Sequence, residues 1–174
     1  VVVSEMGTEE CEALALAADI ERGGDEWFDA LYPALHRVAC VAAPGDVDPD
    51  DLVQDALVRF LQLDDHAHVR SPRAFLTTTI VNLASNHRRS WVRRRAALVR
   101  LGRADDSRSE FPSDLADLLA LPPHQRAVLY LHHIEGLPYD AVAELVGGTA
   151  AAARKAAERG RAHLAASLAE EERR

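Results

Sequence analysis

The sequence predicts an all-α protein of two small helical domains joined by a flexible linker, with a helix-turn-helix in the C-terminal domain. Three observations support this prediction. Apolar residues recur at three- and four-residue spacing along most of the 174-residue chain, which is typical of amphipathic helices. Glycine and proline pairs separate these segments. Residues 104–113 are polar and contain a proline, so we place the domain boundary there.

The N-terminal half is expected to contain one weak helix and three stronger ones. The weak helix covers residues 8–22, in an N-terminal extension (residues 1–24) to which we assign no role. The next begins near Asp25 and ends before Pro44-Gly45. Asp48 is the expected N-cap of the third helix, with Pro49 in its first turn. The inward residues of these two helices are Trp27, Phe28, Leu31, Leu35, Val38 and Val41, followed by Leu52, Val53, Ala56, Leu57, Phe60 and Leu61.

Ser71-Pro72 opens a long helix with two different faces. The apolar face carries Leu76, Ile80, Leu83, Ala84 and Trp91 or its neighbours. The other face is a polar stripe whose members follow at spacings of three or four residues. We call it the asparagine-arginine stripe, and it consists of Thr78, Asn82, Asn86, Arg89 and Arg93. Asparagine both donates and accepts hydrogen bonds and arginine offers a fixed fork of donors, so the stripe can bind phosphates and exposed base edges.

Charge is distributed very unevenly along the chain. Residues 66–104 hold nine arginines and no acidic residue, within a protein of net charge −8. The remainder is therefore strongly acidic. Such asymmetry indicates a polyanion-binding element in an acidic carrier, with an arginine-rich solvated helix end as the alternative. Binding of an isolated protein to DNA depends on neutralising phosphates with positive charge. An acidic chain of this kind should therefore bind DNA at physiological salt only when a partner protein carries it.

The C-terminal half is expected to contain four helices. They begin at about Ser113, His124, Tyr139 and Thr149, and Gly147-Gly148 makes a tight turn before the last one. Inward positions of the last helix are Ala153, Ala157, Gly160 and Leu164, and its outward cations are Arg154, Lys155, Arg159 and Arg161. Two helices joined by a glycine turn, the second of them basic, form a helix-turn-helix pattern, although an ordinary helical hairpin looks similar.

Other function classes find little support. The longest apolar runs are far shorter than the roughly 20 residues of a membrane span, and the acidic N-terminus does not resemble a secretory leader, so we expect a cytoplasmic protein. Cys11 and Cys40 are expected to be free thiols. The histidine pairs His66/His68 and His132/His133 lack the spacing of a zinc helix. We therefore expect no catalytic residue, metal or cofactor.

Four sequence blocks, in this order, resemble the extracytoplasmic-function (ECF) class of bacterial RNA polymerase sigma factors. They are DLVQDALVRF at residues 51–60, PRAFL at 72–76 with IVNL at 80–83, LPPHQRAVL at 121–129, and EGLPYDAVAELVG at 135–147. The resemblance covers about residues 25–166. It implies a sigma domain two at residues 25–98, a linker at 99–113, a sigma domain four at 114–168 and a charged tail at 169–174.

The resemblance also implies partners and site residues. The partners are core RNA polymerase, promoter DNA both as duplex and as a melted non-template strand, and an anti-sigma factor. Core polymerase would bind Asp51, Gln54, Asp55 and Arg59. The −10 element, with a flipped base captured by the loop of residues 64–71, would bind His66, His68, Arg70, Arg73, Asn82, Asn86, Arg88, Arg89 and Arg93. The −35 element would bind Thr149, Arg154, Lys155, Arg159 and Arg161 in the last helix.

The sequence departs from the family pattern mainly in the helix-turn-helix. The capping box is lost at residues 138–141, and Gly148 replaces a bulky apolar residue in the turn. Residues 150–153 are all alanine, so base reading would fall mainly to Arg154, Lys155 and Arg159. Two alternatives to a sigma factor therefore stay open: a helix-turn-helix regulator that acts without polymerase, and a sigma-like protein that does not itself initiate transcription.

Overall fold

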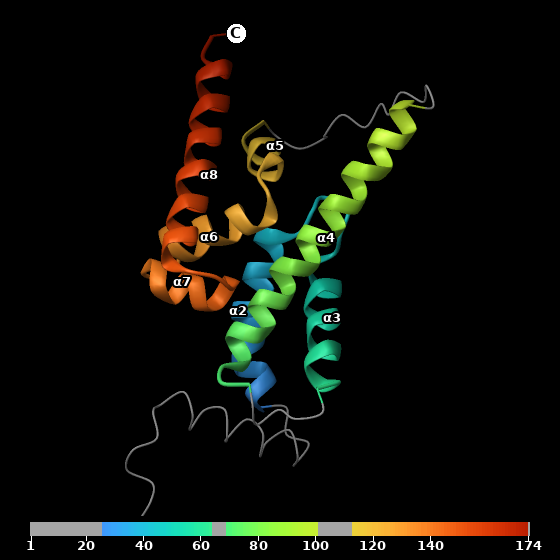
Figure 1. Cartoon of the computed structure of the whole chain (residues 1–174), viewed down its shortest axis with the longest axis vertical. Coiled ribbons are helices and arrows are strands. Elements are labelled where there is room, and N and C mark those ends of the chain that lie inside the picture. The colour runs from blue at the N-terminus through green and yellow to red at the C-terminus, as the bar shows by residue number, and fades with distance from the viewer. Residues whose placement is uncertain (1–25, 64–68, 101–112, 174) are drawn as a thin grey trace, which may run out of the picture.

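A computed structural model describes residues 26–63, 69–100 and 113–173, and the described chain is helical with no β-strand. The expected helix of residues 8–22 lies outside these ranges. Figure 1 shows the arrangement of the helices. In chain order they are α2 (Glu26–Ala42), α3 (Pro49–Leu61), α4 (Pro72–Arg100), α5 (Ser113–Ala120), α6 (Pro123–His133), α7 (Tyr139–Val146) and α8 (Ala150–Glu171).

The first unit consists of α2, α3 and α4, each of which packs against the other two. The predicted start of α3 is confirmed: the Asp48 carboxylate accepts a hydrogen bond from the Asp50 backbone N–H at 2.9 Å, and Pro49 occupies the first turn. Leu35, Val38, Leu52, Val53, Ala56 and Phe60 are buried as predicted, and Leu31, Val41 and Leu57 are half-buried. One inward assignment is wrong. Leu61 is 53% exposed, because it lies in the last turn of α3 on its outer side.

Helix α4 is buried along its first half and exposed along its second. Leu76, Ile80, Leu83 and Ala84 are fully or almost fully buried, as predicted. The apolar face does not continue to Trp91, which is 36% exposed, nor to its neighbour Val92. The helix is longer than the core beside it, so its C-terminal turns extend past α2 and α3 into solvent (Figure 1).

The second unit consists of α5 to α8 and contains the predicted helix-turn-helix, α7 and α8. Gly147 and Gly148 turn the chain with φ of +77° and +133°, a region open to glycine and strained for other residues. Thr149 then caps α8, its hydroxyl accepting from the Ala152 N–H at 3.2 Å. Pro138 provides no side-chain cap for α7, as the lost capping box predicts. Ala153, Ala157 and Gly160 are buried in α8 and Leu164 is half-buried.

The two units pack directly against each other in this structure. Helices α2 and α4 of the first unit contact α6 of the second, and α4 also contacts α7. Their buried side chains form one continuous hydrophobic cluster. The proposed limits of the domains and linker stay predictions, with two structural qualifications: α4 continues to Arg100 and α8 to Glu171.

Candidate polymerase and nucleic-acid interfaces

The outer face of α3 presents the four residues predicted to bind polymerase. Asp51, Gln54, Asp55 and Arg59 are all exposed, while the opposite face of the helix is buried in the first unit. Acidic residues in the first turn are favoured by the positive end of the helix dipole. The structure therefore shows a solvent-facing, mainly acidic helix surface on a rigid support.

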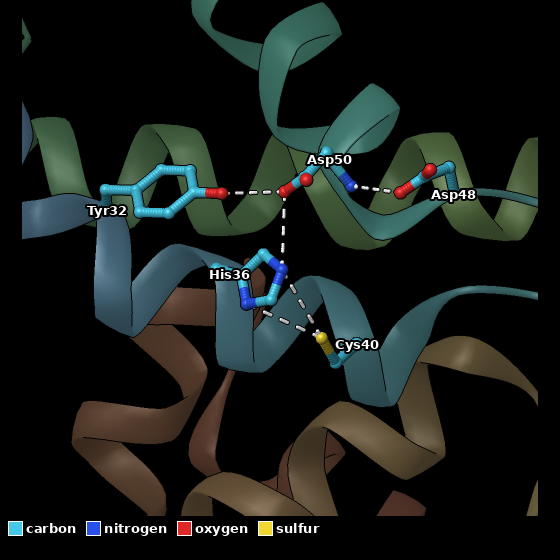
Figure 2. Close-up of polar contacts among 5 residues, drawn as sticks. All are labelled: Tyr32, His36, Cys40, Asp48 and Asp50. Atoms are coloured by element: carbon cyan, nitrogen blue, oxygen red, sulfur yellow. Dashed lines mark hydrogen bonds and ion pairs between the residues drawn. The ribbon is translucent and has the colours of Figure 1, made fainter.

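A network of polar side chains ties α2 to the start of α3 (Figure 2). The Tyr32 O–H donates to Asp50 Oδ1 at 2.7 Å, and His36 Nε2 lies 3.3 Å from the same oxygen. Cys40 Sγ lies 3.6 Å from His36 Nδ1. Burial, together with the negative charge of Asp50, raises the pKa of Cys40, so the free thiol stays protonated near neutral pH. Within the described ranges no His, Cys, Asp and Glu group is arranged to hold a metal ion.

Sequence reasoning missed an apolar part of the outer face of α3. Val58 is 51% exposed, and Leu61 is exposed to a similar extent. With Gln54 they follow a spacing of four and three residues, so all three lie on one side of α3. That spacing was available in the sequence and could have identified them. Exposed apolar side chains beside charged ones are typical of a protein-binding surface.

Between α3 and α4 lies an open cavity of about 400 Å³ where acidic and basic side chains meet. Asp51, Gln54 and Asp55 line it from α3, and His87 and Arg94 line it from α4. The arginine-rich helix therefore faces the acidic helix on this side. Part of the positive charge of α4 is offset within the first unit, as the uneven charge distribution suggested.

On another side of α4 the asparagine-arginine stripe borders a larger cavity, of about 820 Å³. The structure brings together most of the predicted −10 residues that it describes: Asn82, Asn86, Arg88, Arg89 and Arg93 all line this cavity. Arg89 Nη2 donates to the Asn86 side-chain oxygen at 2.6 Å. Pro122 and Pro123 of the second unit form another part of the lining. The lining offers many hydrogen-bond donors to an anionic ligand.

Other predicted −10 residues lie elsewhere. Arg70 is exposed, and Arg73 lies close enough to Glu135 of the second unit for its charge to lower the pKa of that carboxylate. Thr78, which belongs to the stripe but not to the predicted −10 residues, donates its hydroxyl hydrogen to the Leu145 carbonyl oxygen at 2.9 Å. His66 and His68 lie outside the described residues. The structure thus groups the asparagines and later arginines but separates Arg73 from them.

In the second unit, an aromatic ring lies against Arg154, one of the predicted −35 residues. The Arg154 guanidinium lies 5.4 Å from the centre of the Tyr139 ring, within cation–π range. Tyr139 in turn stacks on His132 with ring centres 3.9 Å apart. His132 Nδ1–H donates to the Leu137 carbonyl oxygen at 2.8 Å, which fixes the orientation of the imidazole. The side chain of Arg154 is therefore placed through a chain of non-local contacts that sequence reasoning did not identify.

Arg161 is held by a second histidine. Its Nη1 lies 3.4 Å from His133 Nε2. Burial and the nearby His132 and Arg161 lower the pKa of His133, so its imidazole is neutral and accepts the hydrogen bond. Thr149, Lys155 and Arg159 are exposed on the same helix. All five predicted −35 residues thus reach solvent on α8 or its cap.

Comparison with known proteins gives matches in both units. The sequence profile described as Sigma-70 region 2 matches residues 27–95, and that described as Sigma-70, region 4 matches residues 118–164. Among curated proteins, the ECF RNA polymerase sigma factor SigJ of Mycobacterium tuberculosis is 30% identical over 161 residues. The alignment covers 82% of this chain and 50% of that protein, so the chain spans about half the length of this relative. No solved structure matches the chain.

Across residues 26–63, 69–100 and 113–173, none of the helices combines the length and apolar character that crossing a bilayer requires.

Proposed function

Because this chain belongs to the ECF sigma factors, we propose that it binds core RNA polymerase and directs promoter-specific transcription initiation. The observation that supports this most strongly is the order of the two family matches on the two helical units. Region 2 falls on α2 to α4 and region 4 on α5 to α8. In a bacterium, polymerase and promoter DNA both lie in the cytoplasm, where we expect the chain to act.

The outer face of α3 is the proposed docking site for polymerase. Asp51, Gln54, Asp55 and Arg59 supply charge and hydrogen-bonding groups, and exposed Val58 and Leu61 add apolar area beside them. Charged rims around an apolar centre are common in protein interfaces. An anti-sigma factor is a second proposed partner, and this face would serve it for the same physical reasons.

The asparagine-arginine stripe is the proposed site for the melted non-template strand of the −10 element. Its arginines can neutralise phosphates, while its asparagines can donate to and accept from the edges of unpaired bases. Extracting a base from the stack costs a few kcal/mol. Backbone contacts along the cavity lined by Asn82, Arg89 and Arg93 would offset part of that cost.

Helix α8 is the proposed reader of the duplex −35 element. Arg154, Lys155 and Arg159 are exposed on this helix and would read base edges in the major groove, with Thr149 and Arg161 beside them. Exposed Ala151 and Ala152 offer only small apolar contacts, such as those with thymine methyl groups. We therefore expect weaker upstream sequence preference than a side-chain-rich helix would give.

Run-off transcription from a random promoter library with core polymerase tests the proposed function. We expect the chain to yield products that share a −10 element, together with a shorter or weaker −35 element. The isolated chain should bind the same promoters negligibly at moderate salt, because its net charge is −8. A complete lack of product with every sequence would favour the alternative, a sigma-like or helix-turn-helix regulator that does not initiate transcription.

The docking face can be tested separately by charge reversal. Asp55→Arg should weaken binding to core polymerase about tenfold or more, because a reversed charge at an interface leaves like charges facing each other. Asp29→Arg is the matched control, since Asp29 is also an exposed acid of the first unit but lies on α2. Binding can be measured by fluorescence anisotropy of labelled protein. Equal losses for the two variants would argue against a specific face on α3.

A further inference from the structure

One side of α2 carries a row of aromatic rings to which the proposed function gives no role. Phe28, Tyr32 and His36 follow at spacings of four residues, so they lie on one face of the helix. The Tyr32 ring packs between the other two, with its centre 5.2 Å from that of Phe28 and 5.5 Å from that of His36. Tyr32 is therefore held on both sides, and few orientations remain open to its hydroxyl group.

Tyr32 and His36 both point to the carboxylate of Asp50, in the first turn of α3 (Figure 2). The Tyr32 hydroxyl donates to Asp50 Oδ1 at 2.7 Å, and His36 Nε2 lies 3.3 Å from the same oxygen. This hydrogen bond to Asp50 is the main cause that raises the pKa of Tyr32, so the phenol keeps its proton as a donor. Two side chains of α2 thus meet one oxygen of α3.

The contacts of His36 agree on one arrangement of its protons. A neutral imidazole has one nitrogen that donates and one that accepts. The Cys40 thiol is protonated near neutral pH and lies 3.6 Å from His36 Nδ1, to which it can donate. Nε2 then carries the ring hydrogen and donates to Asp50. Tyr32 and His36 therefore act as two donors to a single carboxylate.

The first turn of α3 is held loosely by its own backbone. The first N–H groups of a helix have no partner within the helix. The Asp50 N–H is bonded to the Asp48 carboxylate at 2.9 Å, but the bond from the Leu52 N–H to the Asp48 carbonyl oxygen is long, at 3.4 Å. Typical N–H···O distances are about 2.9 to 3.0 Å. The contacts from α2 to Asp50 therefore matter for the orientation of this turn.

Two residues of the proposed polymerase-docking face lie within about one turn of Asp50. Asp51 is the next residue, and Gln54 follows Asp50 by four positions on the same side of the helix. Both are exposed, and the Asp50 side chain beside them is 51% exposed. A rotation or fraying of the first turn would displace both docking side chains together. Side chains that are already held in their bound geometry lose less entropy when a partner binds.

We infer that Tyr32 and His36 are positioning residues for polymerase binding, which hold the first turn of α3 in the orientation that presents Asp51 and Gln54. This inference rests on the proposed function, because it concerns the docking of core polymerase on α3. Neither side chain needs to contact polymerase in this role. Their effect should therefore appear in the affinity for core polymerase and should depend on Asp51 and Gln54.

Tyr32→Phe tests the role with a small change, because it removes one hydroxyl and keeps the ring between Phe28 and His36. We expect the dissociation constant of the full chain for core polymerase to rise about 2- to 12-fold, the range for one lost hydrogen bond. Fluorescence anisotropy of labelled chain measures it. Run-off transcription at saturating core polymerase should be unchanged, because the docked chain keeps all its DNA-binding side chains.

Tyr130→Phe is the matched control. It also removes one hydrogen-bonded hydroxyl, the donor to Glu135, but on α6 in the second unit. We expect it to leave the affinity for core polymerase unchanged. His36→Ala should weaken binding as Tyr32→Phe does. His36→Gln keeps an N–H donor close to the position of Nε2, and should retain most of the affinity.

A double-mutant cycle separates positioning from a general loss of stability. In a chain that already carries Asp51→Ala and Gln54→Ala, Tyr32→Phe should weaken binding by less than about twofold, because the side chains that it positions are gone. Thermal unfolding followed by circular dichroism gives the stability of each variant. Tyr32→Phe and Tyr130→Phe should lower the melting temperature similarly, by about 2 to 4 °C, so only the affinity distinguishes them.

The outcomes separate this inference from the proposed function. Failure of the unchanged chain to bind core polymerase would overturn both. Unchanged affinity in Tyr32→Phe, with the unchanged chain still binding, would overturn the inference alone. So would an equal loss in Tyr130→Phe, or a full further loss in the background without Asp51 and Gln54. A loss confined to Tyr32→Phe and His36→Ala, and absent from that background, would support the positioning role.

Discussion

The asparagine-arginine stripe on α4 and helix α8 both carry exposed cations, but their side chains are held differently. Arg89 and Arg93 are exposed on a helix that extends past its own core, and a neighbouring asparagine accepts a hydrogen bond from Arg89. On α8, Arg154 lies over the Tyr139 ring and Arg161 lies beside His133. One surface has a high density of exposed charge, and the other has a few cations held against aromatic rings.

This difference suggests a division of work between the two units. A dense, adaptable set of arginines suits a flexible single strand, whose phosphates can adjust to it. A few oriented cations suit a duplex, where base edges have fixed positions and preorganisation lowers the entropic cost of binding. We therefore expect α4 to supply most of the binding free energy, and α8 to supply preference among upstream sequences.

The largest expected effect comes from removing charge from α4. Arg89→Ala combined with Arg93→Ala should reduce open-complex formation roughly 30- to 800-fold, because each lost charge-assisted hydrogen bond costs about 1 to 2 kcal/mol after solvent screening. The slope of log affinity for single-stranded DNA against log salt should become shallower by about 1.4. Permanganate footprinting of holoenzyme on a fixed promoter measures the opening. Arg173→Ala, at the far end of α8, controls for loss of positive charge.

A smaller and more selective effect is expected from Arg154→Ala. Loss of one base-reading arginine typically costs about 1 to 3 kcal/mol, and only at the bases that it contacts. Run-off transcription from the random library should therefore show a relaxed −35 element with the −10 element unchanged. The arginine pair of α4 should instead lower the yield from all sequences alike. A uniform loss in Arg154→Ala would contradict the division of work between the two helices.

The features that the sequence predicted well depend on short-range chemistry. Asp48 and Thr149 were predicted as N-caps, and both accept hydrogen bonds from the backbone two or three residues later. Gly147 was predicted in a tight turn and has positive φ. Caps and glycine turns involve only neighbouring residues, so spacing and residue type are sufficient to identify them.

The features that the sequence did not predict depend on contacts between distant segments. Leu61 and Trp91 fit helical apolar spacing, but Leu61 lies on the outer side of α3, and α4 extends beyond the partners that would cover Trp91. Arg126 is 84 residues from Ala42, whose carbonyl it contacts, so no local pattern marks it. The contact between Arg154 and Tyr139 likewise requires the turn between α7 and α8 to be folded. Periodicity specifies which residues share a face, and tertiary packing decides what that face meets.

Tyr139 allows a finer test of how α8 is preorganised. Tyr139→Leu removes the ring beneath Arg154, and should weaken binding of holoenzyme to the preferred −35 element about two- to fivefold, since an exposed cation–π contact contributes about 0.5 to 1 kcal/mol. Tyr139→Phe keeps the ring and should retain most of the affinity. In the background of Arg154→Ala the leucine substitution should have little further effect. An equal loss from phenylalanine and leucine would assign the effect to the hydroxyl instead.

The smallest expected effect is a dependence of stability on pH that comes from His133. Its pKa in the folded chain lies below the ordinary value of about 6.5, because burial, His132 and Arg161 all disfavour the protonated form. The folded state therefore takes up this proton less readily than the unfolded state. The resulting contribution to stability is fully present above pH 6.5 and is lost as the pH falls below that value through the folded pKa. His133→Gln should flatten the fall in melting temperature between about pH 7 and pH 5, whereas His163→Gln, an exposed histidine on α8, should leave it as steep as before. An unchanged slope in His133→Gln would mean that other groups of the chain set the acid sensitivity, and that the histidine beside Arg161 orients this cation without a measurable effect on folding.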